Sequence, residues 1–355
     1  MDHREIMSGQ RKDPLAFGLR GLLSLGELPY RMVMSHRNRG YDSGKTLIHQ
    51  CGVPVISIGN LTTGGTGKTP LVSYIARYLR RKERRVAIVS RGYGAEAGEE
   101  NDEAAELARS LPDVPHIQDA DRVEAARIAV EELETEVIIM DDGFQHRRLH
   151  RDLDIVVIDA TNPFGYGHLL PRGLLREPLS SLKRAHAVVI SRANLVDQSA
   201  LQSIRQTIAK HSPSAVIAEA VHAPSELLAW PDRTQPLSRL EGKAVALVSA
   251  IGNPEAFAAT VRLCGAEVAA AKALPDHDAY SPETVKSLVQ WLQSLNNPAL
   301  DLVCTHKDLV KLQTDRLAQH DLLALLIDLR FISGEPALQE CIDACLDNAE
   351  QSEVA

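Results

Sequence analysis

A glycine-rich stretch that ends in lysine and threonine is the feature of this sequence with the clearest chemical meaning. Residues 57–71 read SIGNLTTGGTGKTPL. A P-loop has a glycine, four residues and then Gly-Lys-Ser/Thr; its backbone N–H groups surround phosphate, its lysine reaches the β- and γ-phosphates, and its hydroxyl binds Mg²⁺. Gly67, Lys68 and Thr69 fit the end of that pattern, whereas Thr62 stands at its first glycine position. The stretch predicts a nucleotide site with an altered first turn, and a plain strand-to-helix turn is the alternative.

The flanking sequence supplies the elements that such a site needs. The apolar run at residues 53–60 predicts a buried parallel strand. After Lys68, the residues Leu71, Ile75 and Leu79 recur with a helical period. A helix N-terminus would add its positive dipole end to the N–H groups of the turn. We expect the following residues to contact nucleotide: Leu61, Thr62, Thr63, Gly64, Gly65, Thr66, Gly67, Lys68 and Thr69.

Two consecutive aspartates after an apolar run support the nucleotide interpretation. Residues 136–143 read EVIIMDDG, so Asp141 and Asp142 end a predicted strand as a Walker B acid does. Because Mg²⁺ prefers oxygen ligands, we expect one of these carboxylates and the Thr69 hydroxyl to hold the ion, directly or through water. The sequence leaves open which aspartate contacts the metal, and a loop-capping role for both is the alternative.

Individual residues argue against two classes of P-loop protein, the GTPases and the partition-type ATPases. GTPases carry an Asn-Lys-x-Asp base reader, and the nearest match, THKD at residues 305–308, has its lysine one place off. Partition-type ATPases place an extra lysine where this chain has Thr63. Among P-loop proteins, kinases and motors are the other main classes. The alternative to a kinase is a membrane-associated ATPase switch that hydrolyses ATP without phosphorylating a second substrate.

Alternating strand and helix patterns predict an α/β fold with a mostly parallel sheet. Further strands are expected at residues 85–94, 152–160 and 184–194, with a helix at 119–134. Four prolines within residues 213–242 predict an irregular stretch and a boundary. The expected organisation is an N-terminal amphipathic helical region at 1–50, a P-loop core at 51–215, a linker at 216–240 and a smaller C-terminal α/β domain at 241–355.

The N-terminal region combines an apolar stripe with basic residues. Residues 1–50 carry a local charge of about +3, from eight Lys/Arg against five Asp/Glu. Asp13 and Pro14 suit a helix start, whereas Pro29 and nearby glycines argue against one long straight helix. The region is either a helix packed on its own domain or an interfacial helix on an anionic membrane surface. The candidate membrane residues are Leu15, Leu19, Leu22 and Arg20.

The composition excludes several classes of protein. A net charge of −8 argues against nucleic-acid binding, and aromatic residues make up only 4% of the chain. The five cysteines form no CxxC pair, as is typical of a reducing compartment. No run of about 20 apolar residues could span a bilayer, and we expect no cleaved signal peptide.

The whole motif set resembles one known family, the tetraacyldisaccharide 4′-kinases, which are the lipid A 4′-kinases of Gram-negative bacteria. The resemblance covers about residues 14–340, and DDGFQHRRL is its most specific part. It rests on GNLTTGGTGKTP at 59–70, VSRGYG at 89–94, DDGFQHRRLHRDLDIVVIDA at 141–160, LLPRGLLREP at 169–178 and LPDHDAY at 274–280.

The resemblance implies a function as well as a fold. Members transfer the γ-phosphate of ATP, with Mg²⁺, to the 4′-hydroxyl of a tetraacylated glucosamine disaccharide 1-phosphate. They work at the cytoplasmic face of the inner membrane as peripheral proteins, docked on anionic lipid by the N-terminal helix. A P-loop core is joined to a smaller C-terminal α/β domain, with the active site in the cleft between them. No nucleic acid and no obligate protein partner is expected.

The resemblance also implies roles for residues outside the P-loop. Asp102, in ENDEAAEL, stands where the family has its proposed base, and His277 would pair with it across the cleft. Arg122 and Arg176 would bind phosphate, one on ATP and one on the lipid, in an order that the sequence leaves open. Tyr93 would touch ATP or sugar, or else pack. Without the resemblance, Asp102 would be one solvated acid among several and His277 a structural histidine. Two further candidates for phosphate contact follow the aspartate pair, His146 and Arg147.

Overall fold

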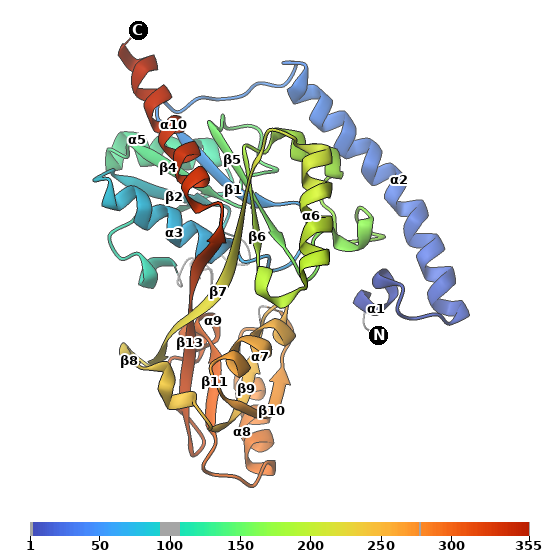
Figure 1. Cartoon of the computed structure of the whole chain (residues 1–355), viewed down its shortest axis with the longest axis vertical. Coiled ribbons are helices and arrows are strands. Elements are labelled where there is room, and N and C mark those ends of the chain that lie inside the picture. Colours follow the sequence, from blue (N-terminus) through green and yellow to red (C-terminus); the bar gives the residue numbers. More distant parts are fainter. Residues whose placement is uncertain (1–2, 93–106, 277, 355) are drawn as a thin grey trace. The chain divides into compact units, whose positions relative to one another are not determined.

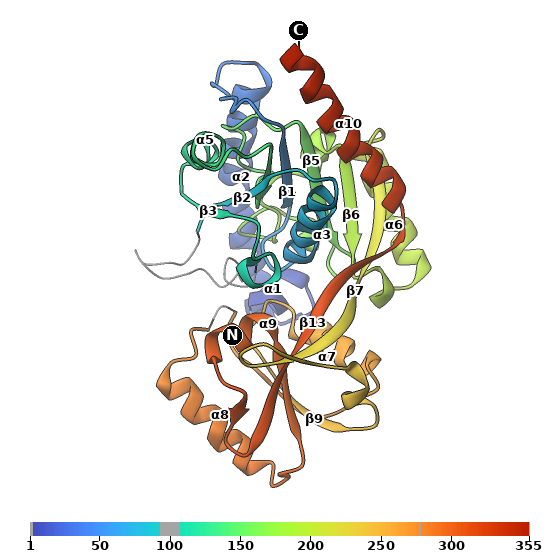
Figure 2. The same cartoon turned by 90° about the vertical axis from the view of Figure 1, so that its left-hand side faces the viewer.

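The structure, a computed structural model, describes residues 3–92, 107–276 and 278–354 of the chain, which divides into two compact units (Figures 1 and 2). The first unit comprises the described parts of residues 1–91, 113–221 and 331–355, and the second those of 92–112 and 222–330. Two strands, β7 (Val216–Ala229) and β13 (His320–Ser333), each begin in one unit and end in the other.

A parallel sheet forms the centre of the first unit, with the strand order β7-β6-β5-β1-β4-β2-β3. The five central strands are buried along their whole length, as expected for a sheet with helices on both faces. Because every strand runs the same way, their carboxyl ends share one edge, where α/β proteins bind ligands. The bounds are β1 (Val55–Asn60), β2 (Val86–Ser90), β3 (His116–Gln118), β4 (Val137–Asp141), β5 (Leu153–Asp159) and β6 (Ala187–Ser191).

Helices cover both faces of this sheet. Alanines of α5 pack against Val55 and Ile138 of β1 and β4, and α6 packs Leu201 and Ile204 against β5 and β6. The α3 helix contacts β1, β2 and β4, and Figure 2 shows α3 and α5 on opposite sides of these strands. The bounds are α3 (Lys68–Arg81), α5 (Arg122–Leu133), α6 (Gln198–His211) and the 3-10 segments η1 (Gly165–Gly167), η2 (Leu179–Arg184) and η3 (Ala193–Leu195).

Two segments differ from the expected domain organisation. The expected linker at 216–240 is mostly β7, β8 (Arg233–Gln235) and η4 (Leu237–Leu240). Pro224 is compatible with a long strand because it lies between the stretches of β7 that pair with β6 and with β8. The C-terminal helix α10 (Glu335–Val354) belongs to the first unit and not to the domain expected at 241–355. It is held there by hydrogen bonds from Tyr74 and Tyr78 of α3 to Glu335 and Asp343, at 2.5 and 2.9 Å.

The second unit is a smaller sandwich of helices around parallel strands, in the order β10-β9-β11-β13. Successive side chains of β9 enter opposite layers: Val245 and Leu247 pack with α7, and Ala246 and Val248 pack with α8. The bounds are β9 (Ala244–Ser249), β10 (Glu267–Ala273), β11 (Asp301–Thr305), β12 (Arg316–Leu317), α7 (Pro254–Leu263), α8 (Pro282–Ser294) and α9 (His306–Leu312).

The N-terminal region contains α1 (His3–Ser8) and one continuous helix, α2 (Pro14–Asp42), whose start is capped by Asp13. Pro29 and the nearby glycines, which argued against one long straight helix, therefore do not interrupt it. The Pro29 ring and the neighbouring Leu25 are exposed, so water can bond the carbonyl that lacks an N–H partner. Gly26 serves close packing, because a Cβ there would lie 3.1 Å from Cγ of Pro171.

Candidate active site

The glycine-rich loop connects the end of β1 to the start of α3 and forms an open cradle. Gly67 precedes the helix with a φ of 85°, and Gly64 has a φ of 107°; both lie in the left-handed region that favours glycine. Gly64 and Gly65 are exposed, and no atom lies within 4 Å of the place that a Cβ would take. The loop therefore leaves room for a phosphate against backbone N–H groups and a helix N-terminus.

Lys68, Arg176 and Asp142 form the charged centre of the site. Arg176 donates from Nη1 and Nη2 to the two carboxylate oxygens of Asp142, at 2.8 and 2.9 Å. The Lys68 Nζ atom lies 3.4 Å from Asp142 Oδ1 and 3.5 Å from Asn60 Oδ1, and Arg176 also donates to that Asn60 oxygen. Burial raises the pKa of Asp142, but Arg176 and Lys68 hold this pKa well below its usual value. Two cations around one carboxylate leave net positive charge for a phosphate group.

A second chain segment carries Arg176 to the loop. The N–H of Arg176 donates to the carbonyl of Leu61 at 2.7 Å, and the N–H of Thr63 donates to the carbonyl of Leu174 at 2.8 Å. These bonds make a short antiparallel pairing in which Thr62 faces Leu175. The resemblance predicted Arg176 as a phosphate ligand, and the structure brings it to Lys68 although the two are far apart in the sequence.

The aspartate pair sits on a tight turn after β4. Asp142 has a φ of 51°, and its N–H donates to Asp141 Oδ1 at 2.8 Å. Gly59 of β1 lies against this turn, because a Cβ there would come within 2.7 Å of the Phe144 nitrogen. The Asp141 and Asp142 carboxylates and the Thr69 hydroxyl supply the hard oxygen donors that Mg²⁺ prefers. No group of three His, Cys, Asp or Glu side chains in the described ranges could hold a metal without further ligands, and a Mg²⁺ site with one or two carboxylates takes its other ligands from phosphate and water.

Two site residues were missed from the sequence, Asn60 and Arg192. Asn60 accepts from Lys68 and Arg176, and its carbonyl oxygen accepts from Gln145 Nε2 at 2.9 Å. Arg192 donates to the carbonyl of Gly65 at 3.1 Å and pairs with Asp159. The available signal was position: Asn60 ends β1, and Arg192 directly follows β6, at the same edge of a parallel sheet.

The remaining residues that we expected to act on phosphate or substrate lie on α5 and just after the aspartate pair, or outside the described residues. Arg122 is buried at the start of α5. Its charge acts on His146: burial and this charge lower the pKa of His146 to about 4, so this histidine is neutral at pH 7. Arg147 pairs with Asp42 at the end of α2, at 2.8 Å, which directs it to the helix. Tyr93, Asp102 and His277 lie outside the described residues.

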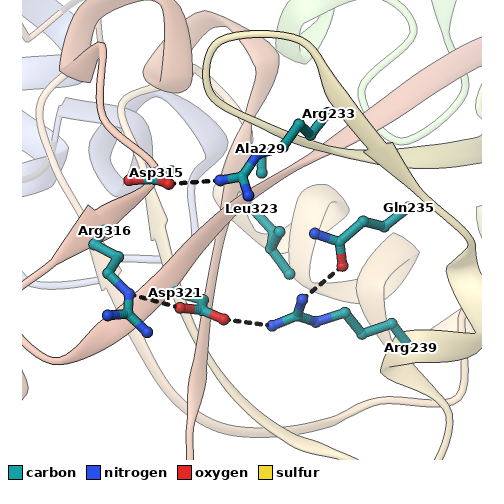
Figure 3. Close-up of a pocket in the computed structure, with 8 residues that line it drawn as sticks. All are labelled: Ala229, Arg233, Gln235, Arg239, Asp315, Arg316, Asp321 and Leu323. Carbon is teal, nitrogen blue, oxygen red and sulfur yellow. Dashed lines mark hydrogen bonds and ion pairs between the residues drawn. The ribbon is translucent and has the colours of Figure 1, made fainter.

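The second unit contains a pocket lined by arginines and aspartates that are paired with one another (Figure 3). Arg239 bonds Asp321 at 2.9 Å, Arg316 bonds the same aspartate at 2.9 Å, and Arg233 bonds Asp315 at 2.6 Å. These ion pairs link β8, η4 and β12 to one another. Because each guanidinium already has a carboxylate partner, the pocket has little net charge with which to bind a ligand.

A parallel sheet whose carboxyl edge carries a glycine-rich loop, a helix-starting lysine and an aspartate pair defines a P-loop phosphotransfer protein. The model of the family described as Tetraacyldisaccharide-1-P 4′-kinase matches residues 19–347, and the chain belongs to this family. The chain is 38% identical to a tetraacyldisaccharide 4′-kinase of Anaeromyxobacter sp. (strain K), over 96% of this chain and 95% of that protein. It is also 38% identical to one of Halothermothrix orenii, over 83% of each. The crystal structure of LpxK from Aquifex aeolicus in complex with ATP is similar with a TM-score of 0.71 and 30% identity, over 92% of this chain and 99% of that one.

The family membership confirms the predicted kinase. The chain phosphorylates the 4′-hydroxyl of a tetraacyldisaccharide 1-phosphate, a step of lipid A biosynthesis. The ATPase switch and the GTPase are thereby rejected. Within the described ranges, no helix has both the length and the apolar character needed to cross a bilayer.

Proposed function

We propose that phosphoryl transfer from ATP takes place at the cradle of residues 61–69, with Lys68 and Arg176 binding the phosphates. The observation that carries this proposal is the cluster of Lys68, Arg176, Asn60 and Asp142 at the carboxyl edge of the sheet. Phosphoryl transfer depends mainly on positioning and on neutralising charge. A planar guanidinium that already spans two acceptors is suited to hold phosphate oxygens in a fixed direction.

The metal and proton-transfer roles are part of the same proposal. Thr69 and one of Asp141 and Asp142 would hold Mg²⁺, which when bound neutralises phosphate charge. Asp102 would accept the proton of the lipid hydroxyl, and His277 would orient Asp102 and tune its pKa. These two roles rest on the resemblance of ENDEAAEL, where Asn101 replaces the glycine of the family's Gly-Asp-Glu, and of PDHDAY to the family.

The remaining candidates would serve the substrates. Arg122 would bind a phosphate of ATP or of the lipid, with neutral His146 beside it as a hydrogen-bonding group. Tyr93 would contact ATP or sugar, on the strength of the VSRGYG motif.

The test is transfer of labelled phosphate from ATP to the tetraacyldisaccharide 1-phosphate in detergent micelles with Mg²⁺. Lys68→Ala should abolish transfer, and Asp102→Ala should lower kcat by roughly 10²- to 10⁴-fold, the range of general base catalysis. Asp102→Ala with near-normal kcat would remove Asp102 from the mechanism. A matched control is Glu83→Ala, which deletes a carboxylate after the end of α3.

We further propose that the outer face of α2 docks on an anionic membrane at the cytoplasmic face of the inner membrane. Leu22, Leu25, Leu28 and Met32 recur at steps of three and four residues and are each more than half exposed. Leu15 and Phe17 extend this exposed apolar face toward the helix start, whereas Leu19 is half-buried. Exposed apolar area of this kind in a soluble domain marks an interaction surface, and a tetraacylated substrate resides in lipid.

Arg20 donates to the Arg11 carbonyl at 2.6 Å, so it also supports the α1–α2 connection. Sedimentation with anionic vesicles tests the docking. Leu25→Asp with Met32→Asp should abolish co-sedimentation while activity on short-chain substrate in detergent remains. Co-sedimentation equal to that of the unmodified protein would refute docking by this face.

A further inference from the structure

The inner face of α2 contacts the backbone segments that carry the phosphate site. The Tyr30 hydroxyl donates to the carbonyl oxygen of Arg176 at 2.9 Å. About two turns further on, Arg37 donates to the carbonyl of Gln145 at 2.6 Å. Gln145 in turn donates from its side chain to Asn60. Tyr30 thus bonds Arg176 itself, and Arg37 is linked to Asn60 through one intervening residue, Gln145.

Two further side chains of the same face anchor the segment on either side of Arg176. Asn38 donates to the fully buried carboxylate of Glu177 at 2.9 Å. Glu27 is only 5% exposed, and its carboxylate accepts from the backbone of Leu169 at 3.2 Å and meets His168 Nδ1 at 3.0 Å. A helix needed only as an apolar anchor would not require a buried carboxylate that bonds the segment leading to Arg176.

Both backbone polar groups of Arg176 are therefore fixed, and by different elements. Its N–H is held by Leu61 of the glycine-rich loop, and its carbonyl is held by Tyr30 of α2. Its guanidinium meanwhile spans Asp142 and Asn60. The position of this side chain relative to Lys68 thus depends on where α2 lies.

We infer that α2 is a positioning helix for phosphoryl transfer, in which Tyr30 is a positioning residue that fixes the main chain of Arg176. This inference rests on the proposed role of Arg176 and extends it. The opposite face of the same helix is exposed and apolar. Binding of that face to lipid would therefore fix the position of α2 and, through Tyr30, the position of Arg176. Catalysis would then be fastest when the helix is seated, which suits an enzyme whose substrate is in the membrane.

Tyr30→Phe removes one hydroxyl and keeps the ring, so the fold should be retained. Loss of this neutral hydrogen bond should lower kcat about threefold to tenfold, with the KM for ATP and vesicle co-sedimentation unchanged. The matched control is Tyr41→Phe on the same helix, whose ring lies under the guanidinium groups of Arg37 and Arg147; its kcat should stay normal. A melting temperature equal to that of the unmodified protein separates positioning from unfolding.

The decisive readout is a double-mutant cycle with Arg176→Ala. If Tyr30 acts through Arg176, then Tyr30→Phe should have no further effect on kcat in the Arg176→Ala background. An equal loss of kcat in both backgrounds would overturn the inference while leaving the role of Arg176 intact. A normal kcat for Arg176→Ala alone would overturn the proposed role of Arg176, and this inference with it. Normal kcat for Tyr30→Phe alone would also overturn the inference.

Discussion

Replacing Arg176 by lysine is the sharpest single test of the proposed phosphate site. The guanidinium makes two charge-assisted hydrogen bonds to Asp142 and a further bond to Asn60. A lysine keeps the positive charge but is a point donor, so it can retain one of these directions and not the fork. Its main chain should stay bonded to Leu61 and Tyr30, because those bonds use backbone atoms of residue 176.

The magnitude follows from the bonds that are lost. Two hydrogen bonds to charged groups are worth about 1.5–3 kcal/mol each, and water replaces part of that loss. A net loss of about 3 kcal/mol in the transition state corresponds to a fall in kcat of roughly 10²-fold. The KM for ATP should change less than kcat, because the fork matters most where charge develops on the transferred group.

The assay is phosphate transfer from labelled ATP at saturating lipid in mixed micelles, with kcat and KM measured separately. Arg239→Lys is the matched control, since Arg239 also bonds aspartates, Asp301 and Asp321, at 2.8 and 2.9 Å in the second unit. It should lower the melting temperature without lowering kcat. The reasoning is refuted if folded Arg176→Lys retains kcat within about threefold of the unmodified enzyme, a difference of less than 0.7 kcal/mol.

Two further predictions concern stability. Gly59→Ala should lower the free energy of unfolding by about 1–3 kcal/mol, because its Cβ would lie 2.7 Å from the Phe144 nitrogen. The control is Gly65→Ala, where the added Cβ has open space. Equal urea midpoints for the two variants would contradict the packing argument. Burial and the charge of Arg122 lower the pKa of His146 to about 4, so between about pH 6.5 and 4 the unfolded chain binds a proton that the folded chain does not. The free energy of unfolding should therefore fall as pH is lowered from 7 to 4.5, and identical slopes for the unmodified protein and His146→Gln would contradict this assignment.

The sheet of the first unit was predictable because its signals are local. Each central strand is a short apolar run, and the expected strands at 53–60, 136–143, 152–160 and 184–194 contain β1, β4, β5 and β6. The P-loop lysine and the aspartate pair could be placed at one edge because parallel strands share their carboxyl ends. The resemblance added Arg176, which no local pattern distinguishes from a surface arginine.

Features set by distant contacts were not predictable. The course of β7 depends on pairing with β6 at one end and β8 at the other, so its proline was misread as a sign of a linker. The attachment of α10 depends on Tyr74 and Tyr78, more than 250 residues earlier. The continuity of α2 depends on which side of the helix Pro29 faces, and that is fixed only when Glu27 and its neighbours are buried against the active-site segment.

Thr62, the residue that breaks the usual P-loop pattern, explains how the altered loop and Arg176 belong together. Thr62 is buried, faces Leu175 in an antiparallel pairing, and its methyl group lies next to Gly165, where an added Cβ would be 3.0 Å away. A β-branched residue favours such extended backbone, whereas a glycine would allow the loop to turn away and would leave this contact empty. The neighbouring bonds then follow from the pairing: Leu61 accepts from Arg176, so the guanidinium is delivered beside Lys68. Threonine in place of glycine at position 62 thus supports the strand pairing that brings the guanidinium of Arg176 into the phosphate site.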